Sequence, residues 1–171
     1  MTTTMTIPEL DAEALYAQLE QQVKTALTGT PQLAIVGIYS GGAWLAERLA
    51  LALGVTDIGY VDVSFYRDDY AEKGLHAEVK PSQINFDVNG ATILLVDDVL
   101  YTGRTTRAAI NTLFDYGRPA KIMLAALLDR GGRQLPVAAD FVAKSIPLAE
   151  EQLLVLQKAE DGRLSLTVDH A

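Results

Sequence analysis

Two adjacent acids in the middle of the chain are the residues best suited to chemistry. Asp97 and Asp98 follow an apolar run, residues 93–96, whose length and β-branched content are typical of a buried strand. In open α/β sheets, ligands bind in the crevice outside the carboxyl ends of the strands. Adjacent carboxylates at such a place can accept hydrogen bonds from neighbouring hydroxyls, so this pair predicts a site for a sugar diol.

A short hydroxyl-rich loop follows the acids and runs into a segment of helical period. The N-terminus of a helix carries free N–H groups and partial positive charge, so it binds phosphate readily. Glycine permits close approach of the backbone, threonine hydroxyls donate hydrogen bonds, and arginine can add charge. The loop is therefore predicted to hold a sugar phosphate beside the diol, through Tyr101, Thr102, Gly103, Arg104, Thr105 and Thr106.

The alternative is a buried strand followed by an ordinary capped helix, with both acids solvated at the sheet edge. As a whole, however, residues 92–106 (TILLVDDVLYTGRTT) resemble the phosphoribosyl pyrophosphate (PRPP) signature of the type I phosphoribosyltransferases. Within that superfamily, VDDVLYTGRT resembles the PyrR family, pyrimidine operon attenuation proteins that often double as uracil phosphoribosyltransferases. The resemblance covers about residues 10–158 and is strongest over residues 92–136.

This resemblance implies transfer of the phosphoribosyl group from PRPP to uracil, giving UMP and pyrophosphate, with Mg²⁺ on the pyrophosphate. Asp97 and Asp98 would hold the ribose hydroxyls, and residues 101–106 the 5-phosphate. A flexible lid, residues 66–83, would close over PRPP and exclude water, and Arg67 would stabilise the departing pyrophosphate. A solvated charged loop in which Arg67 pairs with an aspartate is the alternative for that segment.

A second strand, turn and helix start lies earlier in the chain, at residues 33–53. In the family this turn holds pyrophosphate and reads Lys-Thr-Arg-Gly. Two cations are thus missing here, and backbone N–H groups would bind the anion alone, so weak activity is expected. A plain tight turn capped by Ser40 is the alternative. The pyrophosphate-binding candidates are Tyr39, Ser40, Gly41 and Gly42.

The last third of the chain supplies candidates for the base and the metal. Residues 138–158 resemble part of the family's hood over the base, where Val142, Lys144 and Ile146 are candidates for contacting uracil. Asp129 ends another apolar run. Its carboxylate could bind Mg²⁺ through water or cap a turn, and the sequence does not separate the two.

Charge favours nucleotide chemistry over RNA binding. The formal net charge is −8, and the family's basic residues on the first helix appear here as Ala17, Gln18, Glu20 and Gln21. Arg130 and Arg133 are the basic residues that leave RNA binding open. A UMP-responsive RNA-binding attenuator and a catalytically weak PRPP or nucleotide sensor are therefore the alternatives to a uracil phosphoribosyltransferase.

The order of the elements predicts an α/β fold with a central parallel sheet flanked by helices. The resemblance adds the type I phosphoribosyltransferase fold, with a small hood and a flexible loop. A single domain over residues 1–171 is expected, with a loose leader at residues 1–10. The Asn89–Gly90 turn predicts a hairpin that joins residues 84–86 to the central strand.

Absences in the sequence narrow the class of protein further. There is no cysteine, no apolar run of membrane-spanning length, and no basic region followed by an apolar one at the N-terminus. A cytoplasmic protein without disulfides is therefore expected. The resemblance implies a homodimer or a higher homo-oligomer.

Overall fold

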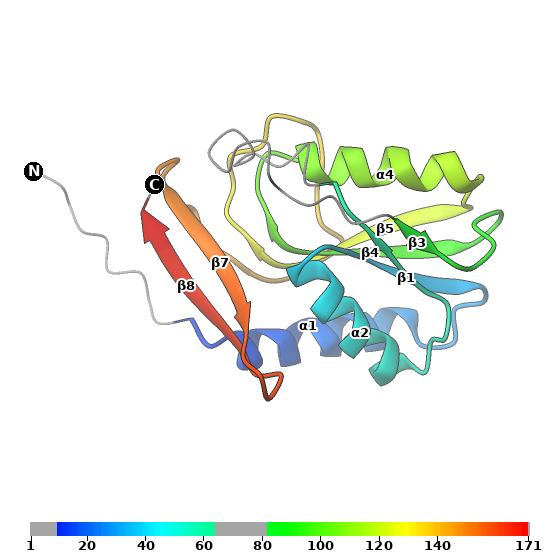
Figure 1. The fold of residues 1–171 in the computed structure, drawn as a ribbon, viewed down its shortest axis with the longest axis horizontal. Coiled ribbons are helices and arrows are strands. Elements are labelled where there is room, and N and C mark those ends of the chain that lie inside the picture. Colours follow the sequence, from blue (N-terminus) through cyan, green and yellow to red (C-terminus); the bar gives the residue numbers. More distant parts are fainter. Residues whose placement is uncertain (1–9, 64–81, 171) are drawn as a thin grey trace, which may run out of the picture.

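The chain folds into a mostly parallel sheet with helices on both faces, beside a separate two-stranded hairpin (Figure 1). The computed structural model describes residues 10–63 and 82–170, so the leader up to residue 9, most of the predicted lid and Arg67 lie outside the described residues. In chain order the elements are α1 (Ala12–Leu27), β1 (Leu33–Ile38), α2 (Gly41–Leu53), β2 (Ile58–Val61), β3 (Gln83–Ile84), β4 (Thr92–Leu100), α4 (Arg104–Tyr116), β5 (Lys121–Asp129), β6 (Phe141–Ser145), β7 (Gln152–Lys158) and β8 (Leu164–His170).

The strand order brings the turns that follow β1 and β4 to the same end of the sheet, next to each other. Within the described residues the main sheet runs β3-β2-β1-β4-β5-β6, and only β3 is antiparallel to its neighbour. β1 and β4 are adjacent at the centre, with Gly37 opposite Val96. From β1 the chain proceeds to β2 on one side, and from β4 to β5 on the other. The carboxyl ends of β1 and β4 therefore border the switch point at which such sheets bind ligands.

Alternate side chains of the central strands enter two hydrophobic cores, one on each face of the sheet. Ile35 and Leu94 belong to the core shared with α1, α2 and the β7–β8 hairpin, whereas Val36 and Leu95 belong to the core under α4. Figure 1 shows α1 and α2 on one side of the sheet and α4 on the other. Both faces of the central strands are thus covered, which explains why residues 93–96 are apolar without alternation, as expected for a buried strand.

The first helix, α1, turns one apolar face to the core. Leu15, Leu19, Val23 and Leu27 are all buried along one face of α1. The side chain of Asp11 accepts the amide of Ala14 at 3.1 Å, which satisfies one of the unpaired donors at the helix start. None of the helices in the described part of the chain is both long enough and apolar enough to cross a membrane.

The predicted hairpin before the central strand is wrong. Residues 83–84 form β3, which pairs antiparallel with β2 through Gly59 and Tyr60 instead of with β4. Asn89–Gly90 does form a turn, with Gly90 at a φ of 74°, but this turn leads into a strand already flanked by β1 and β5. Turn chemistry is local, whereas the choice of a strand's partner depends on the whole sheet.

Candidate active site

The two acids lie at the carboxyl end of β4, at the switch point. Asp97 is only 4% exposed, so it is not a solvated edge residue, while Asp98 is half-buried. Each carboxylate accepts the amide of the following residue: Asp98 N donates to Asp97 Oδ1 at 2.8 Å, and Val99 N donates to Asp98 Oδ1 at 2.8 Å. These bonds orient both side chains before any ligand binds.

The glycine turn after β1 packs directly on these acids. A Cβ added to Gly41 would lie 2.5 Å from Asp98 Oδ2, and one added to Gly42 would collide with the carbonyl oxygen of Val96. Ser40 makes no capping hydrogen bond, so the simple capped turn is not what forms, and the Tyr39–Ser40 peptide bond is cis. The structure therefore brings the N-terminus of α2 against the predicted diol site.

The second predicted anion site is the N-terminus of α4. Gly103 caps this helix in the left-handed region (φ 94°), and the helix begins at Arg104, so the predicted loop, residues 101–106, includes the first turn of α4. Thr102 Oγ1 accepts the amide of Arg104 at 3.1 Å. The first backbone bond of the helix joins Arg107 N to Gly103 O, so the amides before it have no partner within the helix.

One hydroxyl in this turn is enclosed without a partner. Thr106 is 1% exposed, and its Oγ1 makes no hydrogen bond. A buried polar atom that lacks a partner costs about 1–3 kcal/mol, so native proteins rarely keep one without a reason. A phosphate oxygen as the partner of this hydroxyl stays a prediction.

Residues 130–135 form a support for the phosphate loop (residues 101–106) that the sequence did not reveal. They donate hydrogen bonds to three consecutive carbonyls, those of residues 100–102, so the backbone that enters the loop is fixed by a segment about 30 residues further along the chain. The contacts are Arg130 N to Leu100 O at 3.1 Å, Arg133 Nη1 to Tyr101 O at 2.8 Å, Gln134 N to Thr102 O at 2.9 Å and Leu135 N to Thr102 O at 3.1 Å. The Asp-Arg-Gly-Gly-Arg string was the available signal.

The carboxylate of Asp129 forms an ion pair with an arginine. Arg133 pairs with both carboxylate oxygens, at 3.0 and 2.6 Å, and Gly131 N donates to Oδ1 at 2.9 Å. Burial alone would raise the pKa of Asp129, but the hydrogen bonds from Arg133 and Gly131 outweigh it and lower the pKa. This geometry is the turn-capping alternative, and a water-mediated Mg²⁺ contact stays a prediction.

Two of the three base candidates, Val142 and Lys144, lie on β6, the last strand on one side of the main sheet. Val142 is opposite Ala126, and Lys144 is opposite Leu128 near the carboxyl ends. Ile146 N donates to Asp129 O at 2.7 Å. Ile146 therefore lies at the carboxyl end of β5, the same end of the sheet as the two acids. The predicted hood, residues 138–158, is thus divided between the sheet edge and the β7–β8 hairpin.

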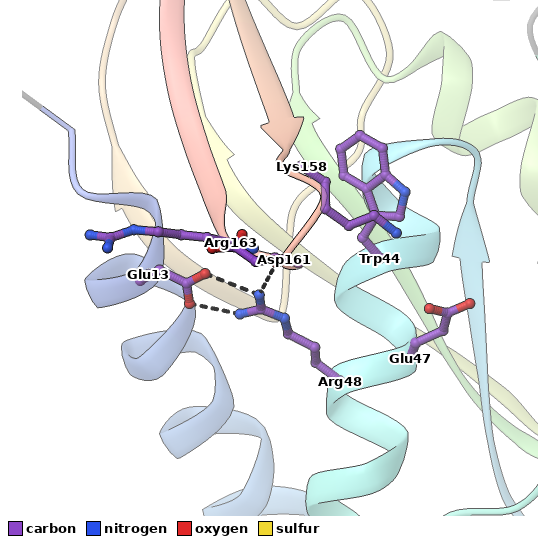
Figure 2. A pocket seen from close by; sticks show the side chains of 8 residues that line it. Glu13, Trp44, Glu47, Arg48, Lys158, Asp161 and Arg163 are labelled. Carbon is purple, nitrogen blue, oxygen red and sulfur yellow. Dashed lines mark hydrogen bonds and ion pairs between the residues drawn. The ribbon is translucent and has the colours of Figure 1, made fainter.

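A separate pocket of about 520 Å³ lies between α1, α2 and the β7–β8 turn, and none of the predicted site residues lines it (Figure 2). Arg48 points from α2 to Glu13 of α1, with contacts of 2.7 and 3.0 Å, and also donates to Gly162 O. Glu13 accepts the amide of Leu164. The hydrogen bond from Arg48 is the main cause that lowers the pKa of Glu13 to about 2. This cluster fastens the hairpin to the helices.

Comparison with known proteins gives consistent matches. The family model of the phosphoribosyl transferase domain matches residues 9–153. The "Bifunctional protein PyrR" of Ralstonia nicotianae is 55% identical, with 92% of each chain covered. The protein of the same name from Nitrosococcus oceani is 45% identical over 95% of this chain and 96% of that one. The one from Thermus thermophilus is 43% identical, with 92% and 90% covered.

Solved structures agree on the fold. A hypoxanthine phosphoribosyltransferase from Staphylococcus aureus superimposes with a TM-score of 0.62 at 24% identity, covering 84% of this chain and 78% of that one. The enzyme of the same name from Trypanosoma cruzi gives 0.62 at 22% identity, with 82% of each chain covered. At this level of identity the likeness concerns the fold alone.

Proposed function

Since the chain belongs to the PyrR family of phosphoribosyltransferases, as its sequence predicts, we propose that it transfers the phosphoribosyl group of PRPP to uracil. The products are UMP and pyrophosphate. In this reaction the bond between the anomeric carbon and pyrophosphate breaks, a bond from that carbon to a ring nitrogen of uracil forms, and the proton on that nitrogen leaves.

The observation that carries the proposal is the meeting of two helix N-termini and two acids at one switch point. Asp98 touches the Gly41 backbone at the start of α2, and β4 continues from the acids into the first turn of α4. PRPP needs two anion sites, one for the 5-phosphate and one for pyrophosphate, with a diol between them. The spatial order of α4, the acid pair and α2 matches that requirement.

Each group has one proposed role. Asp97 and Asp98 accept the ribose hydroxyls, the first turn of α4 binds the 5-phosphate, and the backbone of residues 39–42 binds pyrophosphate. Catalysis then rests on positioning and on electrostatic stabilisation of the leaving group. Arg67, in the predicted lid, would assist departure of pyrophosphate.

The residues suit a magnesium ion that arrives with its substrate. In the part of the chain that the structure describes, no group of three or more His, Cys, Asp or Glu side chains could hold a metal alone. Mg²⁺ is commonly bound through one or two carboxylates together with substrate phosphates. Asp129, which pairs with Arg133, is the residue that would contact the ion, through water. When bound, the ion would neutralise part of the charge on pyrophosphate.

RNA binding is less favoured as the function of this chain. The two arginines that left it open make internal contacts: the side chain of Arg130 is buried, and Arg133 pairs with Asp129. The net charge of −8 also repels a polyanion. A nucleotide sensor with weak turnover is the second candidate, since the turn at residues 39–42 carries no cation.

A steady-state assay tests the proposal. Purified protein is incubated with PRPP and Mg²⁺ and with uracil, orotate, hypoxanthine or guanine in turn, and nucleotide formation is measured. UMP formation is expected with uracil alone, at a modest rate because the turn at residues 39–42 carries no cation. Product from another base would contradict the choice of uracil. Measurable binding of UMP or PRPP without any product would identify the sensor instead.

A further inference from the structure

We propose that Arg130 is a positioning residue that sets the spacing between the phosphate loop (residues 101–106) and the base edge (residues 144–148), and thereby fits the site to a nucleoside monophosphate. The inference rests on the proposed function and extends it, because it explains how the two halves of one ligand are held at a defined separation.

Arg130 bridges the two segments through its backbone. Its N–H donates to Leu100 O at 3.1 Å, at the end of β4, and its carbonyl accepts the amide of Leu148 at 3.3 Å. One residue therefore joins the strand that enters the phosphate loop to the connection that leaves the base edge.

Its side chain repeats the bridge. The guanidinium lies over the ring of Tyr101, with 3.9 Å from Cζ to the ring centroid, and donates to Ala149 O at 2.8 Å and to Gln152 O at 2.6 Å. The planar fork can reach the two carbonyls and stack on the ring at once, which a lysine ammonium cannot do. Gly132 also packs closely on Tyr101, since a Cβ added to it would lie 2.6 Å from the ring atom Cε1.

The arrangement is costly unless it serves a purpose. Arg130 is 4% exposed, and in the described part of the chain its charge meets carbonyl oxygens and an aromatic face, with Nε left without a hydrogen bond. Replacing buried charged groups by apolar residues of similar size is often neutral or stabilising. A buried cation at this junction therefore favours a role in fixing the distance between the two segments over a role in filling space.

Arg48 provides a matched control. It also anchors the β7–β8 hairpin by a bond to a backbone carbonyl, that of Gly162, but it does so at the far turn and touches neither the phosphate loop nor the base edge. Arg48→Met should loosen the hairpin without changing the spacing of the site.

The experiment compares Arg130→Met, Arg130→Lys and Arg48→Met in the full chain. Calorimetric titration with UMP and with ribose 5-phosphate separates the spacing from the phosphate contact, because only UMP must reach both segments. Amide hydrogen exchange without ligand reports how firmly residues 101–106 and 146–152 are held.

Arg130→Met removes two side-chain hydrogen bonds and the stack on Tyr101, which hold the two segments at their spacing. It is expected to weaken UMP binding about tenfold and ribose 5-phosphate binding by about twofold or less. Exchange should rise in both segments. Arg130→Lys should recover part of the UMP affinity, and Arg48→Met should change neither affinity.

Equal losses for the two ligands in Arg130→Met, or unchanged UMP affinity, would overturn the inference. Unchanged exchange in residues 101–106 and 146–152 would overturn it as well. If the wild-type protein binds no UMP, the proposed function fails, and the exchange measurement still decides whether Arg130 holds the two segments together.

Discussion

The turns after β1 and β4 occupy equivalent places in the fold but are held by different contacts. Both leave the carboxyl end of a central strand and enter a helix within a few residues. The turn at residues 39–42 packs on the acids through the backbone of its two glycines, with no room for a side chain on Gly41 or Gly42. The phosphate loop, by contrast, uses hydroxyls and is held in place by the distant residues 130–135.

This difference separates two ways of making an anion site. A glycine turn relies on close approach, so any added atom changes it. A supported loop relies on several side chains and on a second segment of the chain. Removing one of these groups should therefore weaken anion binding only in part. The predictions below test this contrast, starting with the acids that the two sites share.

The largest effect is expected from Asp97→Asn combined with Asp98→Asn. PRPP binding should fall at least about a hundredfold, because two charge-assisted hydrogen bonds of about 1.5–3 kcal/mol each are lost. Asparagine keeps an oxygen for the amides of Asp98 and Val99, so the melting temperature should change little. Asp115→Asn, on the exposed side of α4, is the control. Wild-type PRPP affinity in the double variant would refute the diol site.

Gly41→Ala should act next most strongly. Its Cβ would lie 2.5 Å from Asp98 Oδ2 and must displace that carboxylate, so turnover should drop by roughly tenfold or more, as for the loss of a charge-assisted contact. Gly54→Ala, at the other end of α2, is the matched control. It has open space around the new Cβ but a φ of 67°, so it should cost stability of about 1 kcal/mol and no activity. Normal turnover of Gly41→Ala would show that the turn tolerates added atoms.

Thr106→Val should separate stability from binding. Removing a buried hydroxyl without a partner should leave the free protein equally stable or more stable, while phosphate affinity falls by about tenfold. In Thr112→Val the lost hydroxyl bonds to Ala108 O at 3.1 Å, so that variant should be slightly less stable and bind normally. Thermal unfolding with titration of UMP measures both. Reduced stability of Thr106→Val without a change in affinity would contradict the assignment.

The smallest effect concerns Glu13, which supports neither turn. Its pKa is about 2 in the folded protein against an ordinary value of 4.5, so its contribution is complete above pH 4.5 and is lost as the pH falls towards 2. Since its side chain is about a third exposed, we expect about 1 kcal/mol. Denaturant unfolding of Glu13→Gln should show a shallower loss of stability across that window. The exposed Glu151→Gln should match wild type, and an identical pH dependence in Glu13→Gln would refute the contact.

The sequence by itself determined the family, the parallel sheet and the positions of the acids and the two glycine-bearing turns. These follow from apolar runs, local turn residues and a specific string over residues 92–106, all of which act over short stretches of chain. The same local signals led to the wrong hairpin for residues 84–86, because strand pairing is decided between distant segments, and Ile84 pairs with β2.

Only the tertiary structure decided what Asp129, Arg130 and Arg133 do. In the sequence they read as a possible metal ligand and two possible RNA contacts. In the fold, Arg133 pairs with Asp129, and the buried Arg130 stacks on Tyr101 while holding Ala149 and Gln152. The physical reason is that a charged side chain takes whatever partners the packing of remote segments places within its reach, and spacing along the chain does not contain that information.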